Sequence, residues 1–363
     1  MKEWTTATTI GLGHQDKFGE LAKQLQKSYT VYGDLLLLSP KSVASNVLQT
    51  LSKGASLQLW KTISKHLKVG HIAVNHAIPT YDEHLRRETN TIRSPSNFHP
   101  LYGDFGPSTC SDPPTQQDFD AAFWVSAKQN GIAQIWAPRW TMFSRGNITE
   151  KARLLIVPSV VQAVEAGKAN GRGCAAVDLY AGIGYFTFSY LKAGVDKVLC
   201  WDINDWSVEG LRRGATANKW AAELYDGSQS LAKMAESDAK LLVFNESNEL
   251  ASERIRAMAD LSPPIRHVNC GLLPSSRGSW RTALSVLDAK LGGWIHVHEN
   301  IDQRELDQKV NEIIATFKQL LGNIDNTSAA RELGLESVNR VKAYAPNVYH
   351  YVLDIYVPPR DAG

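Results

Sequence analysis

Long apolar runs are missing from this sequence. No stretch approaches the ~18–20 consecutive apolar residues that a helix needs to span a bilayer. The first twenty residues carry charges and have no apolar centre of the kind found in a secretory signal. We therefore expect a soluble cytoplasmic protein with no membrane partner.

Closely spaced cysteines are missing as well. The chain has four, Cys110, Cys174, Cys200 and Cys270, and no two have the spacing of a zinc knuckle or a CxxC pair. We expect these thiols to be free and buried. An excess of charge of one sign is also missing, since the formal net charge is +2, so any RNA contact has to come from local basic patches.

What the sequence does have is a regular rhythm in its second half. Hydrophobic residues make up 43% of the 363 residues, which is enough for a well-buried interior and for two domains. Short apolar runs alternate with segments that can be helical, notably Trp206–Leu224 and Glu249–Ala259. This alternation predicts a parallel sheet with helices on both faces. The five runs are Ala175–Tyr180, Lys197–Ile203, Lys240–Phe244, Arg266–Leu273 and Gly293–His298.

A long amphipathic segment and a hairpin follow the fifth run. Gln303–Leu321 has apolar residues at helical spacing. Arg340–Tyr344 and Tyr349–Val357 have the character of antiparallel strands around a turn. Five parallel strands and a terminal hairpin are typical of a seven-stranded methyltransferase-type domain, so we predict an α/β fold with a Rossmann-like sheet over residues 135–363.

The N-terminal third lacks this rhythm, and we predict a smaller, separate α+β domain over residues 1–134. The expected segments are helices in Asp16–Ser28 and Ser42–Leu67, strands at Asp34–Leu38 and His71–Ile78, and a loop at Arg93–Asp118.

A glycine turn follows the first apolar run. The segment Val177–Phe186 has the sequence VDLYAGIGYF, with Gly182 and Gly184 at the turn and Asp178 before it. Glycines at such a turn allow the backbone to approach a ligand closely and to adopt positive φ. The dinucleotide fingerprint requires a third glycine where Thr187 stands, which disfavours a nicotinamide cofactor. Asp178 suits a cationic ligand such as S-adenosylmethionine (SAM).

Asp202 ends the second run and is the second candidate anchor. A carboxylate at that place can accept hydrogen bonds from both hydroxyls of a ribose. Either acid alone could be a solvated cap or turn residue, but two acids at successive strand ends favour a ligand site. The third run ends in Asn245–Asn248, whose polar groups would lie beside an adenine.

Further segments carry a family resemblance. They are the string QNGIAQIWAPRWTMFSRGNITEKAR at Gln129–Arg153, the GLLPSS loop at Gly271–Ser276, GGWIHVHEN after it, and VKAYAPNVYHYVLDIYV near the end. With the glycine turn and Asp202, they resemble the aminocarboxypropyltransferases of wybutosine synthesis. That family is a sister of the tRNA guanine-N1 methyltransferases. The resemblance is clear from Gln129 to Val357.

The resemblance implies a set of cofactor-binding residues. Ser144 and Lys151 match the family's first pair of SAM contacts, and Asp202 stands where the family usually has a glutamate. Ser247 and Asn248 match the polar pair after the third strand. From the residues alone, Ser144 could equally cap a turn and Lys151 could be a solvated helix charge.

No general base is evident, and the catalytic residues stay unassigned. Arg145, Pro274 and Ser275 are candidates for positioning the acceptor base. The sister methyltransferases have an Asn-Pro-Pro type loop after the fourth strand, whereas this chain has Leu272–Ser275 without the asparagine. Methyl transfer to guanine N1 is therefore less favoured.

The activity that the resemblance implies is transfer of the 3-amino-3-carboxypropyl group of SAM to 4-demethylwyosine in phenylalanine tRNA. SAM is the co-substrate, methylthioadenosine is released, and neither a metal nor an obligate protein partner is implied. Two alternatives stay open. One is a tRNA guanine-N1 methyltransferase, and the other is a non-catalytic RNA-binding subunit with a SAM-domain fold.

RNA binding is expected to come from local clusters of basic residues. The candidates are Arg139, Arg145, Lys151 and Arg153, with Lys61, Lys65 and Lys68 in the N-terminal part. His296 and His298 point the same way on a strand, at a spacing that a metal could use. Without a third ligand nearby, structural histidines are the favoured interpretation.

Overall fold

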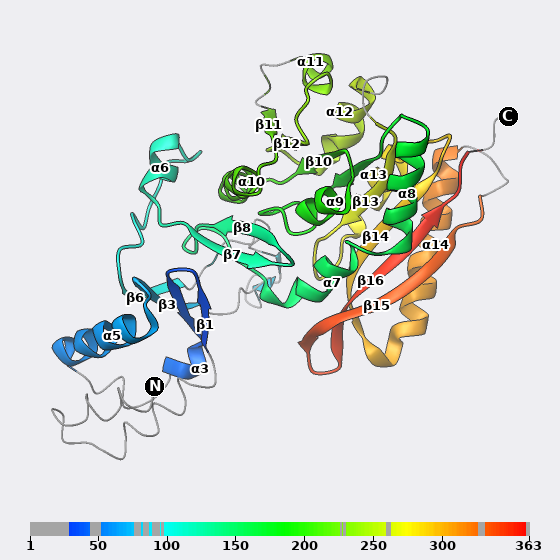
Figure 1. The fold of residues 1–363 in the computed structure, drawn as a ribbon. Coiled ribbons are helices and arrows are strands. Elements are labelled where there is room, and N and C mark those ends of the chain that lie inside the picture. The colour runs from blue at the N-terminus through cyan, green and yellow to red at the C-terminus, as the bar shows by residue number, and fades with distance from the viewer. Residues whose placement is uncertain are drawn as a thin grey trace. The chain divides into compact units, whose positions relative to one another are not determined.

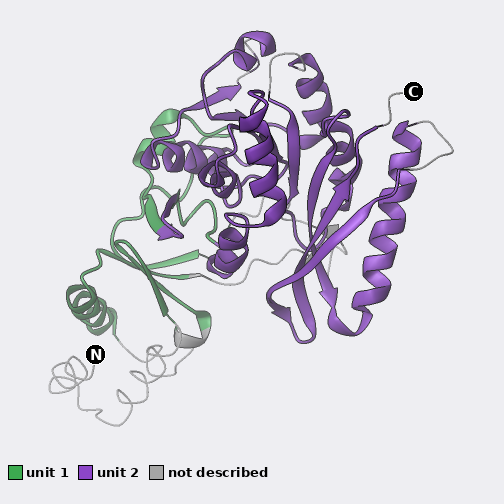
Figure 2. Ribbon diagram, turned by 45° about the vertical axis from the view of Figure 1, so that its right-hand side comes forward, with its two compact units in different colours: residues 1–127, 135–143 green, residues 128–134, 144–363 purple. Residues whose placement is uncertain are grey.

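The computed structural model divides into two compact units, shown in Figure 2. Unit 1 comprises Met1–Ala127 and Ile135–Phe143, and unit 2 comprises Lys128–Gln134 and Ser144–Gly363. The division falls within a hairpin of two strands, β7 (Val125–Gln129) and β8 (Ile132–Trp136). The structure describes residues 29–43, 52–75, 81–82, 87–88, 95, 98–225, 227, 230–258, 263–325 and 331–360.

The core of unit 2 is an eight-stranded sheet in the order β11-β12-β10-β9-β13-β14-β16-β15 (Figure 1). The strands from β11 to β14 are parallel, and β16 pairs antiparallel with both β14 and β15. The five predicted parallel strands and the terminal hairpin are thereby confirmed. In sheet order the strands are Ala222–Tyr225, Leu241–Phe244, Lys197–Trp201, Ala175–Asp178, Ile265–Cys270, Gly293–Asp302, Val348–Val357 and Gly334–Ala345.

The additional strand β11 corrects one prediction. A helix was expected over Trp206–Leu224, but α10 spans Asp205–Ala217 and the chain turns after it, with Lys219 at φ 64°. Ala222–Tyr225 then pairs with β12 at the edge of the sheet. The segment AELY is only partly buried, so it carries no apolar run that would mark it as a strand.

Helices cover both faces of this sheet, and the strand residues alternate between them. In β10, Leu199 and Trp201 belong to one apolar cluster, whereas Val198 and Cys200 belong to the other. Burial on both faces explains why central strands such as β10 and β12 are almost wholly apolar in sequence. The first face is covered by α11 (Leu231–Ala235), α12 (Ala251–Ala257), α13 (Trp280–Val286) and α14 (Leu306–Asp325), and the second by α8 (Pro158–Ala169), α9 (Thr187–Ala193) and α10.

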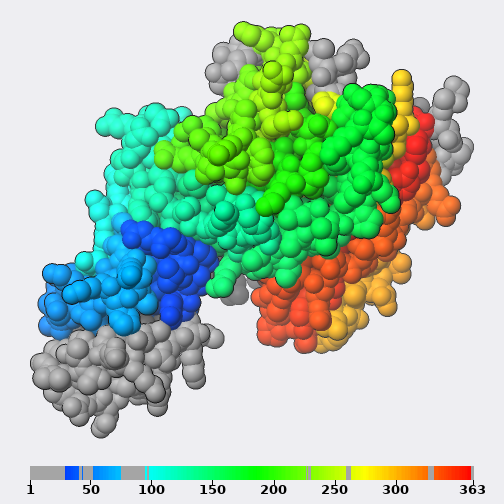
Figure 3. All heavy atoms as spheres, in the orientation of Figure 1, coloured from blue at the N-terminus to red at the C-terminus, as the bar shows by residue number. Residues whose placement is uncertain are grey.

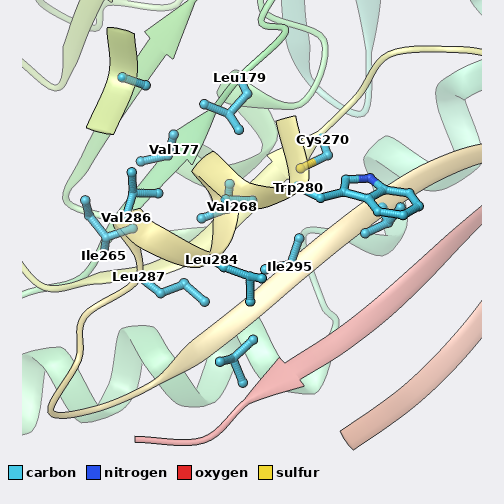
Figure 4. Packing of buried hydrophobic residues seen from close by; sticks show 14 of the residues in the cluster. Val177, Leu179, Ile265, Val268, Cys270, Trp280, Leu284, Val286, Leu287 and Ile295 are labelled. Carbon is cyan, nitrogen blue, oxygen red and sulfur yellow. The ribbon is translucent and has the colours of Figure 1, made fainter. Parts of the chain in front are cut away.

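Figure 4 shows part of the first cluster, where Val268 and Ile295 of neighbouring strands pack with Trp280 and Leu284 of α13. The amphipathic segment Gln303–Leu321 forms a short 3₁₀ turn and then α14, which buries Val310, Ile313, Phe317 and Leu321 as its periodicity predicts. In the space-filling view, α14 and the terminal hairpin form one continuous side of unit 2 (Figure 3).

Unit 1 contains a four-stranded sheet in the order β1-β2-β3-β6. The strands β2 (Leu35–Leu38) and β3 (His71–Asn75) are parallel and are connected through α5 (Lys53–Leu67), so a βαβ unit occurs where no such rhythm was recognised. Its other elements are β1 (Tyr29–Tyr32), α3 (Pro40–Val43), β4 (Tyr81–Asp82), β5 (Arg87–Glu88), β6 (Phe98–Tyr102) and α6 (Gln116–Ala121).

One expectation for the N-terminal part changes. The segment Arg93–Asp118 was predicted to be a loop, but it contains β6 and the start of α6. Pro100 obscured the strand, and it is tolerated because β6 lies at the edge of its sheet. The helix expected at Asp16–Ser28 lies outside the described residues. Among the helices that the structure describes, none is long and apolar enough to cross a membrane.

Candidate cofactor site

The predicted site residues of unit 2 meet at one edge of the sheet. The chain builds outward from β9 through β10 to β12 and then returns to β13 on the other side of β9. Ligands of open α/β sheets bind outside the carboxyl ends of the strands at such a reversal. Gly182 follows β9, Asp202 follows β10, Asn248 follows β12 and Ser275 follows β13. The fold therefore gathers candidates from four strands at this edge.

The turn after β9 requires its glycines. Gly182 has φ 54° and Gly184 has φ 86°, both in the left-handed region that favours glycine. A Cβ atom on Gly184 would lie 2.6 Å from the ring of Phe188, which is fully buried. Any side chain at Gly184 would therefore displace a core residue of α9.

Asp202 is bound to this turn directly. Its Oδ2 accepts a hydrogen bond from the backbone N–H of Gly182 at 2.8 Å, and its Oδ1 accepts one from the N–H of Asn204 at 2.9 Å. Burial raises the pKa of Asp202 to about 6, and the nearby Asp178 and Asp205 add to this rise against the two hydrogen bonds. Asp202 and the glycine turn therefore lie side by side at this edge, and the binding of SAM between them stays a prediction.

The polar pair after β12 is placed at the same edge. Asn248 donates from Nδ2 to the carbonyl oxygen of Leu179 at 2.7 Å, so it joins the loops after β12 and β9. Ser247 is exposed and accepts a hydrogen bond from the N–H of Glu249 at 3.3 Å, which caps a 3₁₀ turn over Asn248–Leu250. Asn245 donates to the carbonyl oxygen of Asp202 at 3.3 Å.

Asp178 lies beneath the turn and is fully buried. Its Oδ2 accepts from the N–H and the hydroxyl of Thr187 at 3.1 and 2.7 Å, and its Oδ1 accepts from Nδ2 of Asn269 at 2.9 Å. Burial raises its pKa. With these bonds the carboxylate fixes the start of α9, so a cofactor would meet the turn that Asp178 supports rather than the carboxylate itself.

Lys151 is buried beside the same turn, with 2% of its surface exposed. It lies in α7 (Ile148–Arg153), and its Nζ donates to the side-chain oxygen of Gln134 at 2.7 Å and to that of Gln129. Gln134 in turn donates to the carbonyl oxygen of Gly184 at 3.2 Å. A chain of two hydrogen bonds thus connects the Lys151 ammonium to the glycine turn.

Ser144 joins this group through the ring of Tyr185. The N–H of Ser144 donates to the Tyr185 hydroxyl at 3.1 Å, and the Lys151 Nζ lies 5.6 Å from the centre of the Tyr185 ring. The Ser144 hydroxyl accepts a hydrogen bond from the Nζ of Lys342 at 2.8 Å. It makes no capping bond to the 3₁₀ turn over Arg145–Asn147, so the capping interpretation of Ser144 is not supported.

The electrostatics of the two lysines are unusual. Burial lowers the pKa of Lys151 to about 7, and the positive charge of Lys342 lowers it further. Burial also lowers the pKa of Lys342. Two ammonium groups are therefore held near each other in a partly dehydrated place, where a negative ligand group would be favourable.

The three candidates for positioning the acceptor base are exposed, unlike Lys151. Arg145 is exposed at the start of its 3₁₀ turn, and Pro274 and Ser275 are exposed in the loop after β13. The Ser275 hydroxyl donates to Oε1 of Glu299 at 2.8 Å, and the same oxygen accepts the N–H of Ser276 at 3.0 Å. The GLLPSS loop is thus held against the end of β14.

The structure corrects part of the expected RNA-binding cluster. Lys151 is buried, and Arg153 donates to Asp354 at 2.6 and 3.0 Å and to Glu150 at 2.7 to 3.1 Å. Neither side chain is available to a phosphate. The expectation that these two residues are exposed was wrong because α7 has only six residues, too few for its buried face to be recognised from the sequence. The lysines of α5 and its C-cap are exposed, namely Lys53, Lys61, Lys65 and Lys68.

The histidines of β14 belong to a buried polar network. His296 Nδ1 lies 2.7 Å from Oδ1 of Asp354 and His298 Nδ1 lies 2.9 Å from Nε2 of His350. His298 Nε2 also lies 3.2 Å from Oδ1 of Asn269. Burial lowers the pKa of His298 well below its usual value. These bonds give both histidines of β14 a structural role; among the described residues there is no group of three or more histidine, cysteine or acidic side chains placed to hold a metal.

Three cysteines of unit 2 are free and buried as predicted, namely Cys174, Cys200 and Cys270, and Cys110 is free and partly exposed. Sequence reasoning missed Gln134, Tyr185, Lys342 and Asn269. The first three stand in segments that carry the family resemblance. Asn269 had no distinct signal in the sequence, because β13 also contains the polar residues Arg266 and His267.

Comparison with known proteins gives relatives over most of the chain. It is 39% identical over 332 residues to tRNA wybutosine-synthesizing protein 2 of Schizosaccharomyces pombe, covering 90% of this chain and 72% of that protein. It is 31% identical to the Saccharomyces cerevisiae protein of the same name, covering 89% and 67%. Among solved structures, P. horikoshii TYW2 in complex with MeSAdo has a similar fold, with a TM-score of 0.63, 18% identity, and coverage of 99% and 100%. No family model matches the chain.

Proposed function

The chain belongs to the tRNA wybutosine-synthesizing protein 2 family, and from this we propose that it is a SAM-dependent transferase of wybutosine synthesis. It transfers the 3-amino-3-carboxypropyl group of SAM to 4-demethylwyosine in tRNA, with methylthioadenosine as the second product. The observation that carries the proposal is the 39% identity over 90% of the chain. The arrangement at the carboxyl edge of the sheet supports it.

The residues at this edge fit SAM. Each oxygen of Asp202 accepts one backbone N–H, and a carboxylate oxygen can accept a second hydrogen bond from a ribose hydroxyl. The glycine turn lets the backbone approach the ligand closely. Asn248 connects the loops that would flank an adenine. The Ser144 hydroxyl and the Lys151 ammonium suit the polar end of the methionine part.

SAM supplies an electrophilic carbon next to a positively charged sulfur, so the protein contributes mainly by positioning. Three carbons adjoin the sulfur, and the carbon that faces the base is the one transferred. Holding the methionine end of SAM beside Ser144 and Lys151 would direct its Cγ towards the acceptor. The loop after β13 presents Leu272 and Leu273, which are partly exposed, as an apolar wall for a flat tricyclic base.

The acceptor is phenylalanine tRNA in this proposal, and unit 1 is its accessory domain. The support is the set of exposed lysines on α5, a helix whose fifteen residues include no acid. Such a face favours phosphate contacts. The cytoplasmic location expected from the sequence stays a prediction.

The test uses two labelled forms of SAM with hypomodified phenylalanine tRNA. Label from the methionine carboxyl should appear in the tRNA, and methylthioadenosine should accumulate. Label from the methyl group alone, with S-adenosylhomocysteine as product, would identify a methyltransferase. Absence of any transfer, with tRNA binding intact, would identify a non-catalytic RNA-binding subunit.

A further inference from the structure

A lysine of the terminal hairpin, far along the sequence, reaches the cofactor edge, by which we mean the edge of the sheet where the parallel strands end and the candidate site lies. Lys342 lies in β15, and its Nζ donates to the Ser144 hydroxyl at 2.8 Å across 198 positions of the chain. Its aliphatic part packs on Gly146, where a Cβ atom would lie 2.7 Å from the Lys342 Cδ. The glycine of the FSRGN segment therefore makes room for this lysine.

The direction of Lys342 is set by an irregularity in the strand. The pairing of β15 with β16 advances by two residues on β15, from Arg340 to Lys342, and by one on β16, from Tyr351 to His350. A bulge of this kind changes which face the following side chain occupies. Without it, Val341 would stand opposite His350 and Lys342 would turn to the other face.

We propose that Lys342 is a binding residue for the carboxylate of the methionine part of SAM, acting together with Ser144 and Lys151. The proposal rests on the proposed function for its ligand. It assigns to β15 a contact that distinguishes the substrate from the product. SAM carries the carboxylate, whereas methylthioadenosine has lost it to the tRNA.

The charges of the site agree with this assignment. The Lys151 ammonium donates to neutral amide oxygens and the Lys342 ammonium to a neutral hydroxyl. Burial lowers the pKa of Lys151, and repulsion from the positive charge of Lys342 lowers it further. A carboxylate between them would replace repulsion by two charge-assisted hydrogen bonds, which are the strong type. After transfer, methylthioadenosine would no longer make these bonds, so the release of methylthioadenosine would be favoured.

The test measures the affinities of SAM and methylthioadenosine by calorimetry. In Lys342→Met we expect SAM to bind about ten- to a hundredfold more weakly, which is typical of a lost hydrogen bond to a charged group. Methylthioadenosine should bind as in the wild type. Lys192→Met is the matched control, because Lys192 is an exposed lysine of the same unit that donates to the carbonyl oxygen of Asn130 at 2.7 Å. It should leave both affinities unchanged.

If Lys342→Met lost affinity for SAM and for methylthioadenosine equally, Lys342 would have only a structural role, and the proposal would be overturned. Loss of tRNA affinity with unchanged SAM affinity would assign Lys342 to a phosphate and also overturn it. If Lys342→Met does not fold, as judged by its thermal transition, Lys342→Arg is measured instead. This variant keeps the positive charge, so its affinity for SAM relative to methylthioadenosine should equal that of the wild type. Methyl transfer by the wild type would refute the proposed function without changing the affinity ratio, so the two failures are distinguishable.

Discussion

Asp202 should make the affinity for adenosine ligands depend on pH. Burial raises the pKa of its carboxyl to about 6, aided by Asp178 and Asp205, which lie near it. Ribose hydroxyls donate to the ionised carboxylate, so a bound ligand lowers this pKa again. Binding then releases a proton, and affinity must fall as the pH drops through about 6.

The size of the effect follows from the fraction ionised. A group with a pKa of about 6 is roughly one-tenth ionised at pH 5, so the affinity at pH 5 should be about tenfold lower than at pH 7.5. Methylthioadenosine is the better probe for this measurement because it has the ribose but no carboxylate. The titration of Lys151 and Lys342 therefore does not enter through the methionine part.

The assay is calorimetry with methylthioadenosine from pH 5 to 7.5, with circular dichroism to show that the fold persists at pH 5. Asp202→Asn keeps the shape of the side chain but has no proton to lose in this range. It should bind about as weakly at both pH values as the wild type does at pH 5, or more weakly. A wild-type affinity that does not change with pH would refute the reasoning, as would the same pH dependence in Asp202→Asn.

Three other outcomes are expected. Gly184→Ala should lower the free energy of unfolding by about 2–4 kcal/mol in urea denaturation, because it combines a left-handed φ with overpacking; a loss below about 1 kcal/mol would contradict this. Asp354→Asn should lower the free energy of unfolding by about 1–3 kcal/mol at pH 7, because His296 loses its buried carboxylate partner and Arg153 is left with Glu150, and unchanged stability would mean that the network is dispensable. Replacing the exposed lysines at positions 61, 65 and 68 of unit 1 with alanine should reduce the log–log salt slope of tRNA affinity by about two to three. An unchanged slope would remove α5 from the RNA-binding surface.

The central strands of unit 2, such as β10 and β12, were predictable because they are buried on both faces. Lys197–Trp201 is buried at every position, so its apolar run is uninterrupted in the sequence. β11 lies at the edge and is only partly buried, so the same signal is absent from AELY. In unit 1, β6 contains Pro100, which is possible only at an edge, and whether a strand lies at the edge is decided by tertiary pairing.

The candidate site divides in the same way. Gly182 and Asp202 could be placed from the sequence because both directly follow a recognisable strand. Lys342 could not, because its partner Ser144 is 198 positions away and its direction depends on a register shift. The positions of the strand ends are a local property of the sequence, whereas the contacts between distant loops are not.

The buried network explains how such a distant lysine can be held accurately. His350 of β16 is paired with Lys342 of β15, and its Nε2 lies 2.9 Å from Nδ1 of His298. His298 in turn contacts Asn269, which donates a hydrogen bond to Asp178 beneath the glycine turn. A slip of β16 by one residue would separate these polar atoms and leave them buried without partners, at a cost of roughly 1–3 kcal/mol for each group. The network therefore penalises every register except the observed one. Because β15 pairs with β16, fixing the register of β16 also fixes the position of Lys342 relative to Ser144. The polar groups inside the sheet thus couple the terminal hairpin to the cofactor edge.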